Sequence, residues 1–91
     1  MEIRYSNDSL KFLHKQPKKT VERIRIAVKN LTLNPPIGDI AILKGYTDGR
    51  KRLRVGNFRV IYKIAADSTL AEVIEIIFVI DIGNRGDIYK K

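Results

Sequence analysis

The sequence predicts an α+β domain in which two helices pack on one face of a sheet. Three observations lead to this expectation: helical periodicity in the first third of the chain, a hairpin pattern around a Gly-Asn turn, and a last run of apolar residues. At 91 residues the chain has room for one thin core. We therefore expect a single domain over residues 1–91, with an N-terminal strand, two helices, and then a three- to four-stranded antiparallel sheet.

The N-terminal part carries the helical signals. Residues 1–5 alternate in the manner of a short edge strand, and Asn7 or Asp8 is placed to cap a helix that ends near Lys15. Pro17 suits the start of a second helix. Apolar residues at spacings of three and four give that helix one buried stripe, which consists of Val21, Ile24, Val28 and Leu31.

A hairpin is predicted over 50–55 and 58–64, because Gly56-Asn57 between them suits a type II′ turn. Paired residues share a face of a hairpin, and side chains alternate along each strand. One face is then apolar and packs on the helices; it consists of Val55, Phe58, Leu53, Val60 and Tyr62. The opposite face carries Arg50, Arg52, Arg54, Arg59 and Lys63 around Ile61.

Shorter signals surround this hairpin. A short extended piece is expected over 42–45, before the hairpin, and a turn at 66–70 after it. The run over 72–82 is apolar on both faces apart from its acids, as expected of a central strand covered on each side. A short C-terminal segment follows.

The charge distribution suggests a polyanionic partner. The formal net charge is +8, and between Lys44 and Lys63 seven basic residues stand against one acid, Asp48. Like charges directly opposite one another destabilise a sheet, so a bound polyanion would explain why Arg54 faces Arg59. Arginine predominates on this face, which favours bidentate contact with phosphate. The alternative is a solvated face that happens to be basic.

Composition argues against several other classes. The chain has no cysteine and a single histidine, His14, so we expect no disulfide, no metal site and no cofactor. The N-terminus lacks a signal-peptide pattern, and the longest apolar run is too short for a membrane helix. We expect a cytoplasmic protein with no membrane partner.

The segments LKG, RLRVGNFRVIYKI and IGNRGDIYKK, in this order of elements, resemble the RelE/ParE superfamily of bacterial toxins from type II toxin–antitoxin modules. The resemblance covers essentially the whole chain and implies a small RelE-like fold. The RelE branch implies a ribosome-dependent endoribonuclease that cleaves mRNA, and the ParE branch implies an inhibitor of DNA gyrase. As partners, the resemblance implies a cognate antitoxin, the ribosome and mRNA, and operator DNA bound by the toxin–antitoxin complex through the antitoxin.

The resemblance also assigns site residues. The RelE-type basic positions fall on Arg50, Arg52 and Arg59, and the C-terminal Arg and Tyr of the family fall on Arg85 and Tyr89. From these matches and the predicted basic face, the catalytic candidates are Arg52, Arg59, Arg85 and Tyr89, and the RNA-binding candidates are Lys44, Arg50, Arg54 and Lys63.

One departure from the family pattern affects the chemistry. Many members carry a histidine just before the C-terminal arginine, where this chain has Asn84. Arginines stabilise charge but are poor proton donors, which leaves Tyr89 as the candidate for proton transfer. The match favours an mRNA interferase of the RelE type. The alternatives are a gyrase inhibitor and a non-catalytic basic module that binds RNA or DNA.

Overall fold

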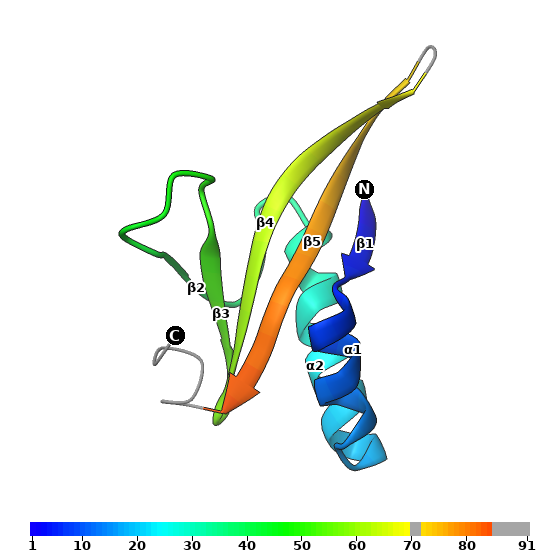
Figure 1. Cartoon of the computed structure of the whole chain (residues 1–91), viewed down its shortest axis with the longest axis vertical. Coiled ribbons are helices and arrows are strands. Elements are labelled where there is room, and N and C mark those ends of the chain that lie inside the picture. Colours follow the sequence, from blue (N-terminus) through cyan, green and yellow to red (C-terminus); the bar gives the residue numbers. More distant parts are fainter. Residues whose placement is uncertain (70–71, 85–91) are drawn as a thin grey trace.

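The computed structural model describes residues 1–69 and 72–84 of the chain (Figure 1). One sheet runs through the domain, with the strand order β1-β5-β4-β3-β2. The elements, in chain order, are β1 (Glu2–Tyr5), α1 (Asn7–His14), α2 (Lys18–Lys29), the 3-10 helix η1 (Asn30–Thr32), β2 (Asp39–Ile42), β3 (Lys51–Val55), β4 (Phe58–Thr69) and β5 (Glu72–Asn84). The predicted α+β class and order of elements are confirmed.

The four strands after the helices pair antiparallel with one another, as predicted. β1 is an edge strand, also as predicted, but it lies parallel to β5 and extends the sheet to five strands. The sequence pattern did not specify this pairing, because the partners come from the two ends of the chain. With β1 on one side and β4 on the other, β5 is a central strand.

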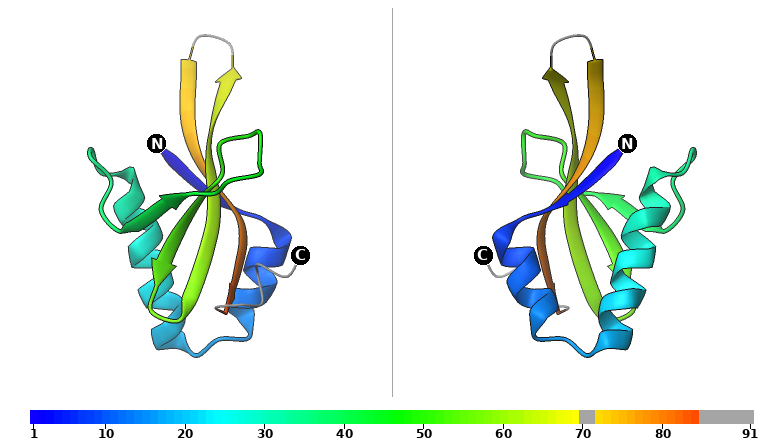
Figure 2. Two further views of the ribbon diagram at one scale, coloured as in Figure 1. Left: turned by 90° about the vertical axis from the view of Figure 1, so that its left-hand side faces the viewer. Right: turned by 90° about the vertical axis from the view of Figure 1, so that its right-hand side faces the viewer.

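The core lies between the sheet and the two helices, which cover the same face (Figures 1 and 2). α1 packs on β5, and α2 packs on β3. In the predicted stripe of α2 and η1, Ile24, Val28 and Leu31 are buried and Val21 is half-buried. Across from them, the predicted apolar face of the hairpin is buried at Leu53, Val55, Val60 and Tyr62. Phe58 completes it by an edge-on contact with Phe12, with 5.8 Å between ring centroids.

The cap of α1 is Ser6, so the prediction of Asn7 or Asp8 was wrong. All three residue types cap helices well, but Ser6 alone combines extended dihedral angles with a hydroxyl that accepts a hydrogen bond from Ser9 N at 3.1 Å. The same hydroxyl donates to Ile80 O at 2.7 Å, and Ser9 Oγ donates to Val79 O at 3.2 Å. The cap therefore also joins α1 to β5.

Two strand boundaries differ from the prediction. The turn expected at 66–70 is wrong because β4 continues through Thr69, with Ala66 paired to Glu75. The hairpin of β4 and β5 projects beyond the other strands as a two-stranded arm (Figures 1 and 2). The extended piece expected over 42–45 is also wrong: β2 ends at Ile42, and the chain turns at Gly45, where φ is +88°.

Among the described residues, no helix is long and apolar enough to cross a membrane.

Candidate nucleic-acid interface

The register of β3 and β4 assembles the predicted cluster of cations. Gly56 takes a φ of +60° at the turn, and Val55 pairs with Phe58, as predicted. The same register sets Arg54 opposite Arg59 and places Arg52 opposite Ile61. The side that faces away from the helices carries Arg52, Arg54, Arg59 and Lys63, and Arg50, just before β3, contacts the same Asp48 oxygen as Lys63. We call these five cations the basic face.

Asp39 lies on this face because β2 pairs with β3 and sets Asp39 opposite Arg54. Its carboxylate contacts two arginines at long range, with 3.6 Å from Oδ1 to Arg52 Nη1 and 3.5 Å from Oδ2 to Arg54 Nε. Ion pairs of this length at a half-exposed carboxylate contribute little to stability. Arg52 is largely buried, and among the described residues its Nη1 has no hydrogen-bond partner.

Asp48 lies at the other end of the basic face, in the loop 43–50. Both of its carboxylate oxygens accept a hydrogen bond from Arg50 Nε, at 3.0 and 3.2 Å, and Lys63 Nζ lies 3.8 Å away. The hydrogen bond from Arg50 is the main cause that lowers the pKa of Asp48 below its ordinary value. The guanidinium carbon of Arg50 also lies 4.5 Å from the centroid of the Tyr46 ring.

A third acid, Asp81, comes from β5 and pairs with Ile61 between the arginines. One of its oxygens accepts a hydrogen bond from the backbone of Ile82 at 3.0 Å. This acid comes from outside the segment that supplies the cations. The chain between Lys44 and Lys63 holds one acid, but strand pairing also brings Asp39 to Arg52 and Arg54 and places Asp81 beside Ile61.

Arg59 differs from the other four cations because it is only 3% exposed. Its Nη1 donates a hydrogen bond to Phe58 O at 3.2 Å, and the residue paired with it on β5 is Gly83. No carboxylate of the described residues forms an ion pair with it. An arginine keeps its charge when buried, and removing that charge from water is costly. A phosphate can reach this guanidinium only after a local rearrangement.

The remaining predicted site residues are Lys44, Arg85 and Tyr89. Arg85 and Tyr89 lie outside the described residues. Lys44 is exposed in the loop 43–50, and Asn84 is exposed at the end of β5. Tyr62 belongs to the core, as expected, and burial raises its pKa. Within residues 1–69 and 72–84, no group of three or more His, Asp or Glu side chains could hold a metal ion.

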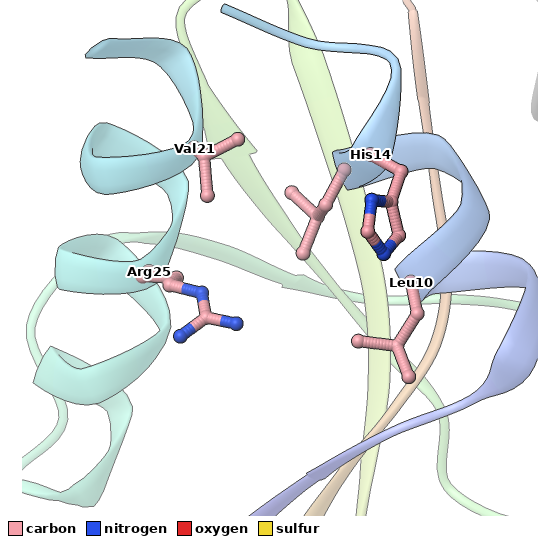
Figure 3. Close-up of a pocket in the computed structure, with 5 residues that line it drawn as sticks. Leu10, His14, Val21 and Arg25 are labelled. Atoms are coloured by element: carbon pink, nitrogen blue, oxygen red, sulfur yellow. The ribbon is translucent and has the colours of Figure 1, made fainter. Parts of the chain in front are cut away.

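A second concave feature lies on the helical side of the domain. A shallow, open pocket separates α1 from α2, with Leu10 and His14 on one side and Val21 and Arg25 on the other (Figure 3). His14 is exposed, as the sequence predicted. The pocket is separated from the basic face by the sheet itself, so the two cannot form one site.

Comparisons with known proteins agree with this architecture. The family model described as the ParE toxin of the type II toxin–antitoxin system parDE matches residues 3–89. Among solved structures, the chain is similar to a chain of the RelB-RelE antitoxin–toxin complex from Methanococcus jannaschii. The TM-score is 0.68 at 23% sequence identity, over 96% of this chain and 95% of that chain. A search of curated proteins gives no match.

Proposed function

This chain belongs to the ParE toxin family of type II toxin–antitoxin systems, within the RelE/ParE superfamily, and we propose that it acts by cleaving mRNA on the ribosome. The observation that carries the proposal is the opposition of Arg54 and Arg59, with Arg52 two residues along β3 on the same side. The guanidinium groups of Arg52 and Arg59 suit the charge that develops on phosphorus during RNA cleavage, and the exposed Arg54 between them attracts the RNA.

The chemistry requires little from the protein besides electrostatic stabilisation and proton transfer. RNA supplies its own nucleophile, the 2′-hydroxyl, and arginines can stabilise the phosphorane that forms. Asp48 is held ionised by Arg50, so it cannot protonate a leaving group near neutral pH. In this proposal Arg52 and Arg59 stabilise charge together with Arg85, and Tyr89 transfers the proton.

In this proposal the ribosome positions the RNA, which the site cannot do by itself. Arg59 is buried, and the cations around it are paired with acids, so free RNA meets a site that is not open to it. A large assembly that fixes the message against the basic face can compensate through positioning, which lowers reaction barriers without any new catalytic group. We expect purified protein to leave naked RNA largely intact.

A second candidate function is inhibition of DNA gyrase. The description of the matching family favours it, because that description names ParE. The pairing of Asp39 with Arg52 and Arg54 is also compatible with a face that binds a protein target and never contacts a phosphate. The third reading, a basic module that binds RNA or DNA without catalysis, remains the alternative from another class.

We also propose a cognate antitoxin as the physiological partner. The similar solved structure is described as an antitoxin–toxin complex, and a net charge of +8 on 91 residues suits an acidic polypeptide.

One experiment separates the three functions. The chain is induced in bacterial cells, the 5′ ends of messages are mapped by primer extension, and the purified protein is added to a gyrase supercoiling assay. New 5′ ends within translated messages, with unaffected supercoiling, support the nuclease. Inhibited supercoiling without new ends overturns it in favour of the gyrase inhibitor. If neither new 5′ ends nor inhibited supercoiling are observed, the non-catalytic binding module is the function that remains.

A further inference from the structure

We propose that the cluster of Tyr46, Asp48, Arg50 and Lys63 is a subsite for one nucleotide of single-stranded RNA. Three of these residues come from the loop 43–50, and Lys63 comes from β4. The base would stack on Tyr46, and the phosphate would take the place of the Asp48 carboxylate. The inference rests on the proposed function only in that it takes RNA as the ligand.

Tyr46 provides the stacking surface. Its ring is half exposed, although an aromatic ring at the surface gains more by packing into a core. The Arg50 guanidinium carbon lies 4.5 Å from the ring centroid and holds the ring beside the basic face. An exposed aromatic ring next to a row of cations is the combination by which proteins bind single strands, since every base has a face that can stack.

Arg50 and Lys63 provide the phosphate position. Both already converge on one anionic group, with 3.0 Å from Arg50 Nε and 3.8 Å from Lys63 Nζ to the same oxygen of Asp48. A phosphate oxygen between them would meet the same two donors. The three side chains are about one-third exposed, so water screens these ion pairs and exchanging Asp48 for a phosphate costs little.

The arrangement of Arg50 joins the two halves of the subsite. Its guanidinium contacts the Tyr46 ring and donates to Asp48 at the same time, so a base on the ring and a phosphate at the Asp48 position lie on either side of one side chain. A base and its own phosphate are similarly close within a nucleotide. Asp48 then acts as a competitor that the nucleotide must displace, which keeps the subsite weak toward RNA that the ribosome does not hold in place.

The test measures binding of a fluorescently labelled single-stranded RNA oligonucleotide to the full chain by anisotropy, over a range of salt concentrations. Tyr46→Ala should weaken binding by about tenfold, whereas Tyr46→Phe should retain it. Asp48→Asn should tighten binding and steepen the plot of log affinity against log salt by about 0.7, the value for one further phosphate contact on a single strand. Glu22→Gln removes the same charge from an exposed position on α2 and is the matched control.

Melting temperatures of all variants show whether each still folds. The inference is overturned if Tyr46→Ala binds as tightly as the unchanged protein, or if Asp48→Asn alters affinity and salt slope no more than Glu22→Gln does. It is also overturned if the variants change binding of an acidic protein partner and leave RNA binding intact, since the cluster is then a protein-docking site. Because binding is measured, absence of cleavage would contradict the proposed nuclease without affecting these readings.

Discussion

Arg54 and Arg59 lie directly opposite each other on β3 and β4, yet Arg54 is exposed and Arg59 is buried. Arg54 interacts with Asp39 at 3.5 Å, whereas Arg59 donates to the carbonyl of Phe58. An exposed cation in water attracts an anion from a distance, and a buried one stabilises charge far more strongly at contact. In the proposed nuclease, Arg54 therefore attracts the RNA and Arg59 stabilises charge at contact.

Arg59→Ala should lower the rate of mRNA cleavage by about a hundredfold or more, because in the proposed mechanism it removes a guanidinium that contacts the developing charge once the message is in place. Ribosome binding should change far less. Single-turnover cleavage at saturating ribosome measures the first quantity, and cosedimentation with ribosomes measures the second. Arg54→Ala is the matched control: it should weaken binding and its salt dependence while the saturated rate stays nearly intact. An unchanged saturated rate in Arg59→Ala would contradict its catalytic role.

Tyr89→Phe tests proton transfer at a position outside the described residues. Phenylalanine keeps the ring for stacking and loses the hydroxyl, so the saturated cleavage rate should fall by about a hundredfold if the phenol moves a proton. The same single-turnover assay applies. Tyr89→Phe with a normal rate and Tyr89→Ala with a low rate would assign the residue to stacking instead.

Association with an acidic antitoxin should slow steeply as salt rises, because a positive face steers an oppositely charged chain during encounter. Stopped-flow fluorescence at low and at high ionic strength gives the association rate constants. Arg54→Gln should lower the low-salt rate and leave the dissociation rate nearly unchanged, since Arg54 is an exposed cation. Equal rates at both ionic strengths would remove the electrostatic explanation.

Arg50→Gln should raise the pKa of Asp48, since the hydrogen bond from Arg50 is the largest cause that lowers it. Lys63→Gln should raise it less, because Lys63 acts at longer range. Because Asp48 has a lower pKa in the folded protein than in the unfolded chain, its carboxylate stabilises the fold when the pH is above its unfolded-state pKa. This stabilisation is lost as the pH falls through its folded-state pKa. Carboxyl ¹³C chemical shifts followed by NMR over acidic pH give the pKa in each variant. If Lys63→Gln raised the pKa of Asp48 more than Arg50→Gln does, Lys63 and not Arg50 would be the main cause of the lowered pKa.

Ser6→Ala should destabilise the fold by about 1 to 3 kcal/mol, because it removes the cap of α1 together with a hydrogen bond to β5. Urea unfolding gives the free energy. Thr32→Ala is the control, since its hydroxyl donates only to the nearby carbonyl of Lys29 in an exposed position. Equal losses in the two variants would show that the bond between Ser6 and β5 is energetically unimportant.

The parts of the fold that the sequence predicted are those fixed by local chemistry. Gly56-Asn57 sets a two-residue connection, and that connection alone determines that Val55 pairs with Phe58 and Arg54 with Arg59. The spacing of apolar residues in α2 likewise predicted Ile24 and Val28 as core. Where several residues suit one role, as at the cap of α1, composition could not choose among them.

The parts that the sequence missed depend on pairings between distant segments. Asp39 contacts Arg52 and Arg54 only because β2 lies beside β3, and no residue near Asp39 in the sequence predicts this strand pairing. The burial of Arg59 is equally nonlocal. Tyr46 was overlooked although a signal was present, since a tyrosine four residues before the first arginine of the hairpin is an aromatic at the margin of a basic run.

The parallel pairing of β1 with β5 constrains when the domain can form. Ser6 finds its acceptor, the carbonyl of Ile80, 74 positions later in the chain. During translation, β1 and α1 emerge first and must wait for β5, since the strand on which they pack is the last of the described strands to be made. A nascent chain stalled before β5 therefore exposes the apolar side of α1, which makes it a target for chaperones and proteases. The domain is therefore complete only once β5 has been synthesised.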